Sequence, residues 1–541
     1  MRGTLLISTI VHATLAALTL ATLGALRFPV HAATPALTPA PAPCESLASL
    51  ALPHTRIESA QPVAAGAFVS PVARGGETAG AAAAGGRAGR GGAPVYSFAN
   101  TPAFCRVTAT LTPSGDSDIK AEVWLPATGW NGKYQAVGGG GWAGAISYPA
   151  MAVAVAAGYA TASTDTGHRG VGTADFALGH PEKLIDFGYR AIHETTVFAK
   201  PIVDAFYGSA PKISFFNGCS TGGRQAITEA QRYPNDFDAI VAGASAWDGM
   251  RMHALRVAVS QRVNSNPDGI IPASKLPMVH TAVLDACDAL DGVNDGVIEN
   301  PLACHYDFTR LACKGADGPD CLTRGQVESA KALTSPLKDL KSGKVIDERH
   351  LWPGAELGWT TLGDASPLGL SVSGLANVLY KDPQWDWHTF EVSKGMEEAA
   401  KADGGALFSG DPNLKPFFAH GGKLLMYHGW TDPQVTPQTS TIYYDKVLKA
   451  VGAEAAAKGI ALFMVPGMNH CQGGAGTDTF DKMAAIEAWV ASGAPPKQII
   501  ASHRTNGQVD KTRPLCPFPQ VARYKGAGDT NDAASFACAA P

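Results

Sequence analysis

The feature that most constrains the fold of this 541-residue chain is a glycine-flanked serine between a strand pattern and a helix pattern. The letters run ISFFN, GCSTG and GRQAITEAQR, so Ser220 is the central residue of a G-x-S-x-G segment at 218–222. Small neighbours permit a tight turn, and the N-terminus of the following helix favours negative charge. The segment therefore predicts a serine hydroxyl held above the edge of a sheet in an α/β protein.

Strand and helix patterns alternate on both sides of this turn. The apolar runs that predict strands are Arg106–Leu111, Ile119–Leu125, Tyr134–Val137, Tyr159–Thr164, Ile213–Asn217, Ala239–Gly243, Lys423–His428 and Ile460–Val465. Helical patterns cover Tyr189–Phe206, Gly222–Arg232 and Phe480–Ser492, with a further helical or buried apolar run at Ala152–Ala157. Such alternation indicates a mostly parallel sheet covered on both faces.

The alternation is lost between about Trp247 and Asn413, where loops, short helices, four cysteines and four tryptophans accumulate. We interpret residues 247–413 as a lid domain inserted into a core formed by residues 104–246 and 414–541. Residues 33–103 form an N-terminal segment whose Ala/Gly-rich stretch, near 66–92, has no repeating apolar face and is expected to be flexible.

The first 32 residues have the pattern of a secretory signal peptide. Arg2 precedes an apolar run from Leu5 to Leu26, and Val30 and Ala32 form a V-x-A cleavage pattern. The run is long for a signal peptide, so an uncleaved membrane anchor is the alternative. Cleavage would change the formal charge from −4 to −6, because this segment holds two arginines and no acid. We therefore expect a secreted or periplasmic protein with no membrane association and no basic field for nucleic acid.

A nucleophilic serine needs a histidine base and an acid that orients it. Asp432 follows the strand pattern KLLMYH, and His470 follows ALFMV, so the acid and the base come after Ser220 in chain order. His428 is the rival base, but its place within a strand favours a buried structural histidine. Asp432 has an alternative role as a helix N-cap.

Ten cysteines form an even set in a chain that is expected to be exported. Sequence proximity suggests the pairs Cys287–Cys304, Cys313–Cys321 and Cys516–Cys538, and leaves Cys44, Cys105, Cys219 and Cys471 without an assigned order. A bond between Cys219 and Cys471 would hold their Cα atoms within about 4.4–6.8 Å. That bond would bring the neighbouring Ser220 and His470 together; separate pairing of each cysteine is the alternative.

Acyl transfer also needs hydrogen-bond donors for the developing oxyanion. The run Gly138–Gly141 follows a strand and can bring backbone N–H groups near the serine, with Gly139 and Gly140 as the candidates. The N–H of Thr221, the residue after the serine, is the second candidate donor. A flexible turn is the alternative interpretation of the glycines.

A separate acidic loop, CDALDGVNDGV, spans residues 287–297. Its two glycines and its asparagine disfavour a helix, and a loop can wrap the side chains of Asp288, Asp291 and Asp295 and the carbonyls of Val293 and Val297 around a cation. All-oxygen ligands favour calcium. An acidic turn without metal is the alternative.

Taken together, these segments resemble the tannase and feruloyl esterase family, which also includes the hydrolase of mono(2-hydroxyethyl) terephthalate. The resemblance covers essentially the whole mature chain. It is carried by FNGCSTGGRQAITEAQRYPNDFDAIVAGA, CDALDGVNDGVIENPLAC, DPQWDWHTF, HGWTDPQV and GMNHCQGG. The family pattern implies an α/β-hydrolase core with a large inserted lid, Ser220, Asp432 and His470 as a catalytic triad, disulfides Cys219–Cys471 and Cys44–Cys105, and structural calcium at Asp288, Asp291, Val293, Asp295 and Val297.

The resemblance implies a serine esterase that cleaves small esters of aromatic acids through an acyl-enzyme and needs no organic cofactor. A galloyl esterase, a terephthalate-monoester hydrolase and a serine peptidase are the alternatives among enzymes. A non-catalytic binding protein with the same fold is the alternative outside them.

Overall fold

The computed structural model describes residues 41–71, 96–265 and 268–541. The expected signal peptide at 1–32 and most of the Ala/Gly-rich stretch lie outside these ranges. None of the helices in the described ranges has the length and apolar character that a bilayer span requires.

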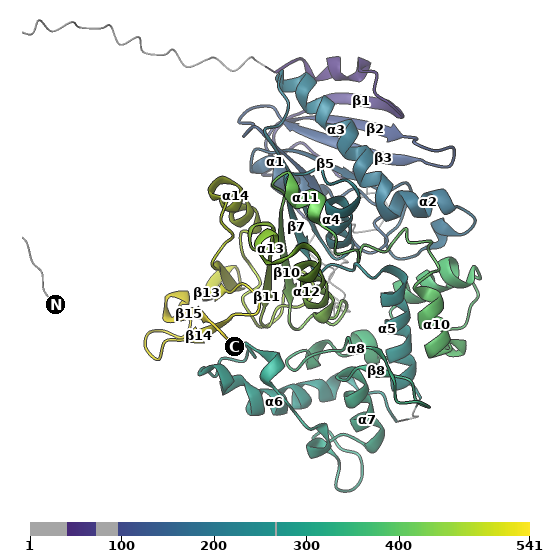
Figure 1. Cartoon of the computed structure of the whole chain (residues 1–541), viewed down its shortest axis with the longest axis vertical. Helices are drawn as coiled ribbons and strands as arrows, with labels where there is room; N and C mark the ends of the chain where they lie inside the picture. The colour runs from purple at the N-terminus through teal and green to yellow at the C-terminus, as the bar shows by residue number, and fades with distance from the viewer. Residues whose placement is uncertain (1–40, 72–95, 266–267) are drawn as a thin grey trace, which may run out of the picture. The chain divides into compact units, whose positions relative to one another are not determined.

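A nine-stranded mixed sheet forms the centre of the described chain (Figure 1). Its spatial order is β1-β2-β3-β5-β4-β6-β7-β10-β11, antiparallel from β1 to β5 and parallel from β5 to β11. The strands are β1 Thr55–Val63, β2 Phe104–Leu111, β3 Ile119–Pro126, β4 Lys133–Val137, β5 Ala160–Thr164, β6 Ile213–Cys219, β7 Ala239–Gly243, β10 Lys423–Gly429 and β11 Ile460–Val465. All eight runs expected to be strands are therefore strands.

Strand β1 was not expected from the sequence. It pairs antiparallel with β2 at the edge of the sheet. Its residues TRIESAQPV include two charged side chains and a proline, and only Ala60 is buried. An edge strand of this kind lacks the apolar alternation that reveals a strand from sequence.

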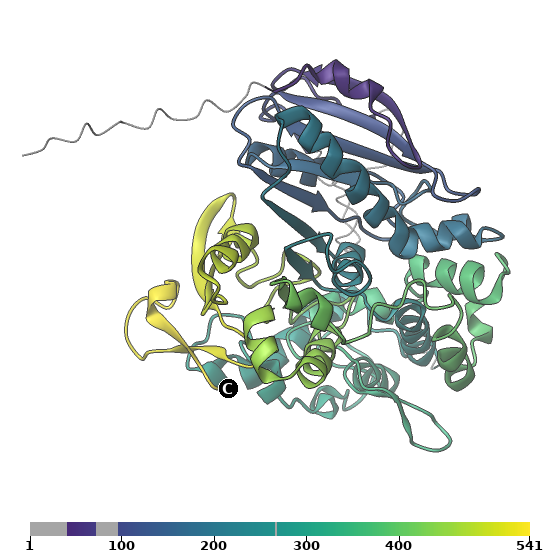
Figure 2. The same cartoon turned by 45° about the horizontal axis from the view of Figure 1, so that its top comes forward.

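Helices cover both faces of the sheet. Helices α3, α4 and α12 supply Phe198, Ile227 and Tyr443 to one hydrophobic cluster. On the other face, α14 packs Ile486 and Trp489 against Phe215 and other strand residues. In Figure 2, α3 lies across the antiparallel strands, where it contacts β3 and β5. The core helices are α1 Tyr148–Ala156, α2 Pro181–Ile185, α3 Ala191–Tyr207, α4 Thr221–Arg232, α11 Lys415–Ala419, α12 Gln438–Val451, α13 Ala453–Gly459 and α14 Lys482–Ser492.

A large insertion separates the neighbouring parallel strands β7 and β10. It contains α5 Gly249–Val263, α6 Leu276–Cys287, α7 Arg324–Leu333, α8 Thr360–Gly363, α9 Gly369–Gly374 and α10 Val392–Ala399, with the short pair β8 Leu337–Lys338 and β9 Val345–Asp347. These elements gather beside one another in Figure 1 and share a hydrophobic cluster that also includes Trp142, Ala143, Ala174 and Phe187 of the preceding segment. The insertion is therefore packed against the rest of the chain through a common apolar cluster.

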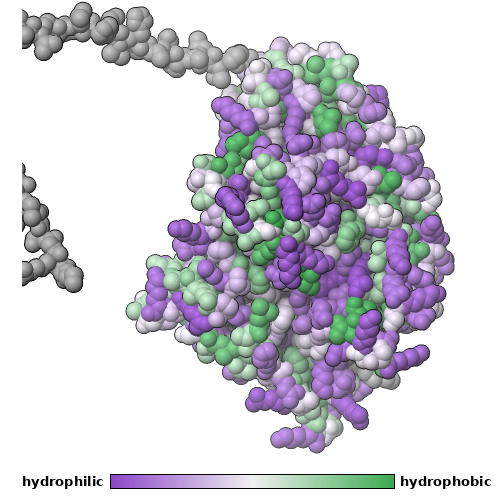
Figure 3. All heavy atoms as spheres, in the orientation of Figure 1, coloured by the Kyte–Doolittle hydropathy of each residue, from purple (hydrophilic) through white to green (hydrophobic). Residues whose placement is uncertain are grey.

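The C-terminal residues form two small antiparallel pairs, β12–β13 and β14–β15. Their bounds are β12 Ile499–Thr505, β13 Gln508–Leu515, β14 Val521–Tyr524 and β15 Phe536–Ala539. In the view of Figure 3, hydrophobic residues form small separate patches among hydrophilic ones. The apolar side chains are thus concentrated in the interior clusters.

Helix α4, which follows the predicted nucleophile, contains a fully buried carboxyl group. Glu229 is 1% exposed. Burial, followed by the charge of Asp236, raises its pKa well above the ordinary value, although Lys200 opposes this shift. The folded chain therefore keeps a proton that the unfolded chain loses above about pH 4.5. The free energy of unfolding therefore falls as pH rises above about 4.5, because the unfolded state then binds fewer protons than the folded state.

Replacing Glu229 by glutamine removes this ionisable group. We expect the melting temperature of Glu229→Gln minus that of the parent protein to be larger at pH 8 than at pH 5. Thermal unfolding at both pH values measures this difference. The same difference at pH 5 and pH 8 would show that Glu229 is not held protonated.

Candidate active site

The turn between β6 and α4 places Ser220 in a strained backbone conformation. Its φ and ψ angles are 62° and −121°, a positive φ that is rare for a non-glycine residue. The Ser220 N–H donates to the carbonyl of Gly243 on β7 at 3.0 Å, and the Ser220 carbonyl accepts from the N–H of Arg224 at 3.0 Å. These two hydrogen bonds fix the strained backbone conformation of Ser220, one to the sheet and the other to the first turn of α4.

Two glycines at this turn, Gly218 and Gly223, are required by close packing. A Cβ on Gly218 would lie 2.5 Å from the carbonyl carbon of Gly222, and a Cβ on Gly223 would lie 2.1 Å from the carbonyl oxygen of Gly243. Neither position can accept a side chain without moving the backbone. The glycines thus allow α4 to start directly against the sheet.

Asp432 and His470 lie on the loops after β10 and β11 and contact each other. The His470 Nδ1 is 2.6 Å from the Asp432 Oδ2. Both side chains are buried, and the second oxygen of Asp432 accepts the N–H groups of Gln434 and Val435 at 2.8 and 3.0 Å. Asp432 therefore caps its own turn, but the next helix, α12, begins only at Gln438.

Burial would raise the pKa of Asp432, but nearby histidines outweigh it. The charge of His470 and hydrogen bonds from His428 and His470 hold the pKa of Asp432 below its ordinary value. Asp432 is thus a carboxylate at neutral pH. A carboxylate in contact with Nδ1 favours the histidine tautomer whose Nε2 accepts a proton.

His428, which the sequence predicts to be a buried structural histidine, is a second histidine partner of Asp432. Its side chain is completely buried in β10. The Nε2 lies 3.1 Å from the Asp432 Oδ2 and 2.8 Å from the carbonyl oxygen of Val435, and the Nδ1 lies 2.7 Å from the Ser440 Oγ. Both ring nitrogens are occupied, so His428 orients Asp432 and has no nitrogen left for a reacting proton.

The disulfide Cys219–Cys471 joins the serine turn to the histidine loop. Its Cα atoms are 6.0 Å apart, although the two cysteines are separated by 252 positions in sequence. Ser220 and His470 line one cavity of about 490 Å³. The other disulfides are Cys44–Cys105, Cys287–Cys304, Cys313–Cys321 and Cys516–Cys538, so all pairs that proximity or the resemblance indicated are present.

The glycine run at 138–141 lines the same cavity, but its N–H groups are not equivalent. The N–H of Gly139 donates to the side-chain oxygen of Gln225 at 3.0 Å. The N–H of Gly140 has no partner in the described part of the chain. Thr221 is the first residue of α4, where a backbone N–H has no intrahelical acceptor. The role expected for Gly139 as an oxyanion donor therefore conflicts with its bond to Gln225.

Core and insertion both contribute to the cavity wall. Trp142 follows the glycine run, and its Nε1 donates to the carbonyl of Leu370 in α9 at 3.1 Å. The Trp142 ring stacks on His253 from α5, with centroids 5.1 Å apart and an interplanar angle of 13°. Phe187 and Met252 add further apolar surface. The wall can thus accept a flat hydrophobic group beside Ser220.

Several basic side chains in the cavity had not been identified from sequence. Arg224, His253, Arg256 and Lys482 all line it. In the sequence, only their positions could have indicated a place in the cavity. Arg224 closely follows the G-x-S-x-G segment, and His253 and Arg256 lie one turn apart on α5. Burial lowers the pKa of Arg224 and of Arg256 to about 10, so both remain cations at neutral pH.

The predicted calcium loop lies in the insertion, against the C-terminal hairpin. Asp288 is buried, and its Oδ2 accepts the N–H of Gly296 at 2.8 Å. Burial, followed by the charges of Asp295 and Asp288, raises the pKa of Asp291 to about 6. The Asp295 Oδ2 contacts the Lys511 Nζ at 3.1 Å and the Arg513 Nη2 at 2.5 Å. The loop thus concentrates carboxylates, and two basic side chains offset part of their charge.

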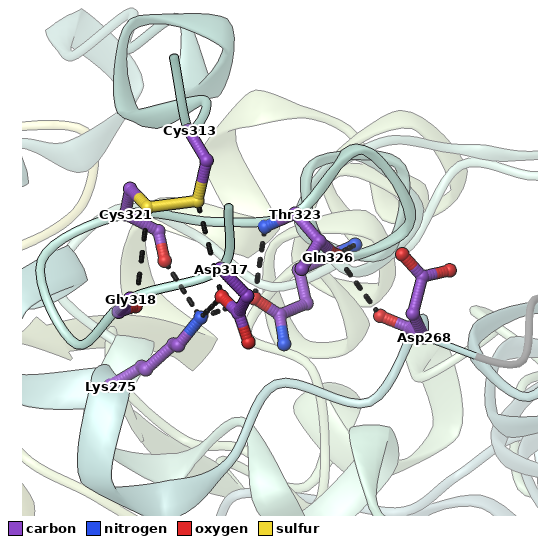
Figure 4. The surroundings of a disulfide bond; sticks show 8 residues. All are labelled: Asp268, Lys275, Cys313, Asp317, Gly318, Cys321, Thr323 and Gln326. Carbon is purple, nitrogen blue, oxygen red and sulfur yellow. Dashed lines mark hydrogen bonds and ion pairs between the residues drawn. A yellow bond between two sulfur atoms is a disulfide. The ribbon is translucent and has the colours of Figure 1, made fainter. Parts of the chain in front are cut away.

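Among the described residues, the side chains of Cys313, Asp317 and Cys321 bring three possible metal-ligand atoms within 4.8 Å of one another, which the acidic side chains of the 287–297 loop do not. Figure 4 shows that the two sulfur atoms are bonded to each other and that Asp317 points to the ammonium group of Lys275. Lys275 also donates to the carbonyl of Cys321 at 2.8 Å and to Gln326 at 3.0 Å. Disulfide sulfurs are not thiolate ligands, so this cluster is a structural link and not a metal site.

Comparisons with known proteins agree with this geometry. The model of the family described as tannase and feruloyl esterase matches residues 105–539. An uncharacterised esterase of Xanthomonas campestris pv. campestris is 36% identical, over 96% of this chain and 94% of that protein. A probable feruloyl esterase B-2 of Aspergillus terreus is 31% identical, over 80% of this chain and 86% of that protein. The crystal structure of feruloyl esterase B from Aspergillus oryzae has a TM-score of 0.81 and 28% identity, covering 92% of this chain and 99% of that one.

The fold and these relatives define a carboxylic ester hydrolase of the α/β-hydrolase type. Within this class, the chain belongs to the tannase and feruloyl esterase family.

Proposed function

We propose that the protein is a secreted serine esterase that hydrolyses esters of aromatic, phenolic acids of the feruloyl or galloyl kind. The observation that carries the proposal is the arrangement of three residues: Ser220 on its strained turn, and His470 in the same cavity with its Nδ1 held by Asp432. The five disulfides support an oxidising compartment.

In the proposed reaction, the Ser220 Oγ attacks the ester carbonyl while the His470 Nε2 takes the hydroxyl proton. Asp432 stabilises the imidazolium that forms, and His428 keeps Asp432 in place. The N–H groups of Thr221 and Gly140 bind the oxyanion. His470 then returns the proton to the departing alcohol, and a water molecule, deprotonated by His470, releases the acid from Ser220.

The substrate proposal rests on the apolar wall and on the family. The insertion acts as a lid whose α5 and α9, with Trp142, hold the aromatic ring of the acid.

Purified mature protein should be assayed with methyl ferulate, methyl gallate, mono(2-hydroxyethyl) terephthalate and methyl butyrate. We expect one aromatic ester to exceed methyl butyrate in kcat/KM. A higher kcat/KM for methyl butyrate would contradict the aromatic assignment.

We also propose that the acidic loop holds a structural calcium ion. The side chains of Asp288, Asp291 and Asp295 and the carbonyls of Val293 and Val297 offer the oxygen donors that calcium prefers. The raised pKa of Asp291 supports a cation here, because burial and neighbouring carboxylates disfavour its charge. A bound ion would neutralise this charge and fasten the loop between the insertion and β13.

Chelation should therefore destabilise the protein. We expect EDTA to lower the melting temperature on the order of 3 °C, because a ligand that binds only the folded state stabilises that state. Added calcium should restore the original value. Asp291→Asn should respond less to EDTA, whereas Asp317→Asn, next to the Cys313–Cys321 disulfide, should respond like the parent protein. Equal melting temperatures with and without EDTA would contradict the site.

A further inference from the structure

The N–H groups of the glycine run at 138–141 are of two kinds. The first two donate to the Asn217 carbonyl and to the Gln225 Oε1, each at 3.0 Å. The last two have no acceptor among the described residues, although both of their glycines line the cavity. Unpaired N–H groups at the cavity are what a developing oxyanion requires. The run therefore offers donors from its second half only.

Two side chains of α4 hold this half of the run. Thr221 and Gln225 are four positions apart, so their side chains lie on the same face of the helix. The Thr221 Oγ1 donates to the carbonyl of Gly141 at 2.5 Å. The Gln225 Oε1 accepts from the N–H of Gly139 at 3.0 Å. These bonds lie on either side of Gly140, so they fix its peptide relative to the helix that follows the nucleophile.

The amide of Gln225 is buried where α4 meets the glycine run. The residue is 1% exposed, and a Cβ on Gly138 would stand 3.0 Å from its Oε1 and 2.6 Å from the Gly222 Cα. Its Nε2 has no acceptor among the described residues. A buried N–H group without a protein acceptor is costly, and an apolar side chain would fill the same space without that cost. The presence of glutamine is therefore explained by its Oε1 and the contact with Gly139.

We infer that Gln225, together with the Thr221 hydroxyl, positions the glycine run for oxyanion binding. By accepting the N–H of Gly139, Gln225 leaves the N–H of Gly140 as the donor that faces the negative oxygen formed when Ser220 attacks. Gln225 is a positioning residue, because it does not line the cavity. The inference rests on the proposed function, since an oxyanion forms only if Ser220 attacks an ester.

Gln225→Met removes the acceptor and keeps the length of the side chain. We expect its kcat for the best aromatic ester to fall about 10–100-fold, with KM within about threefold of the parental value. The reason is that a misplaced donor matters only for charge that develops in the transition state. Initial rates over a range of ester concentrations measure both constants. The rival arrangement, in which Gly139 is itself the donor and Gln225 competes for its N–H, predicts an unchanged or higher kcat, and that result would overturn the inference.

A transition-state analogue separates positioning from packing. In the trifluoromethyl ketone analogue of methyl ferulate, CF3 replaces the ester methoxy group; addition of the serine hydroxyl to this ketone creates an oxyanion. Coniferyl alcohol has the same ring and chain but no carbonyl group. We expect Gln225→Met to raise the Ki of the ketone by about the factor that it lowers kcat/KM, and to leave the Ki of the alcohol unchanged. Equal changes in both Ki values would show that Gln225 only shapes the cavity.

Gln231→Met is the matched control on the same helix. The Gln231 amide donates to the Asp411 carbonyl at 2.7 Å and to the Tyr443 hydroxyl at 3.0 Å, and this residue does not line the cavity. We expect a lower melting temperature with parental kcat and parental Ki for the ketone. A loss of kcat equal to that of Gln225→Met would mean that both variants act through the stability of α4, and the inference would be wrong.

Thr221→Val tests the same arrangement through a second side chain, and it does so even if Gln225→Met does not fold. The substitution removes the hydroxyl and leaves the backbone N–H of residue 221. We expect a lower kcat and a higher Ki for the ketone, whereas Thr221→Ser should stay within about threefold of the parent protein. Because both side chains hold one run, the double variant should lose less kcat than the product of the two single losses. Parental kcat in Thr221→Val, or losses that multiply, would contradict the shared role.

An activated ester separates the inference from the proposed function. Phenyl acetate is assayed beside the aromatic esters, because oxyanion formation does not depend on the acyl group. Cleavage of phenyl acetate alone, with the expected loss of kcat in Gln225→Met, would support the inference and refute the aromatic substrate. Cleavage of an aromatic ester with parental kcat in Gln225→Met would refute the inference and leave the proposed function intact.

Discussion

Replacing Ser220 by alanine is expected to lower kcat/KM for the best aromatic ester by about 10⁴–10⁶-fold, because loss of the nucleophile removes the acyl-enzyme route. The fold should survive, since the hydroxyl is not needed for the bonds that Ser220 makes through its backbone to Gly243 and Arg224. Initial rates and melting temperatures of the two proteins measure both effects.

Ser245→Ala is the matched control. Ser245 is a buried serine, and its Cα lies 3.1 Å from where a Cβ on Gly223 would stand, close to the same turn. It does not line the cavity. We expect this variant to keep kcat/KM within about threefold. Comparable losses in both variants would mean that Ser220→Ala acts through the fold and not through chemistry.

Removing the disulfide next to the site should affect both stability and activity. The Cys219→Ala/Cys471→Ala double variant opens a loop with a sequence separation of 252, for which chain entropy predicts a loss of about 5.5 kcal/mol. It also frees the histidine loop from the serine turn. A displacement of about 1 Å can cost on the order of 100-fold in rate, so we expect a fall in kcat/KM as well.

The Cys313→Ala/Cys321→Ala variant provides the comparison. This disulfide (Figure 4) has a sequence separation of 8 and lies in the insertion, and neither of its cysteines lines the cavity. Its removal should cost about 2–3 kcal/mol and leave kcat/KM unchanged. If both double variants keep parental kcat/KM, the Cys219–Cys471 bond does not position the two reacting groups.

The parts of the fold that follow from sequence are those with a strong local pattern. Strands β7 and β11 end at the expected residues because they are short, continuously apolar runs that are buried on both faces. The turn at Ser220 was predictable for the same local reason, since glycine, serine and the helix start lie within a few residues. The Cys219–Cys471 proximity needed the family resemblance, because cysteine pairing over long separations does not follow from spacing.

Features that depend on distant contacts do not follow from the local sequence. Strand β1 is recognisable only through its pairing with β2, and the hydrogen bond from the N–H of Gly139 to Gln225 joins residues 86 positions apart. The contact between His428 and Asp432 spans four positions but requires a turn after β10 to form. That Arg256 lines the cavity depends on how α5 packs in the folded chain, because nothing in its own sequence neighbourhood indicates a cavity.

The most direct test of the account is covalent labelling of the intact mature protein by a serine-reactive aryl phosphonate, followed by peptide mass spectrometry. We predict one phosphonyl group per chain, on the peptide that contains Ser220, with labelling prevented by Ser220→Ala and slowed by a competing aromatic ester. Absence of labelling, or labelling of a different residue at a similar rate, would contradict the assignment of Ser220 as the nucleophile.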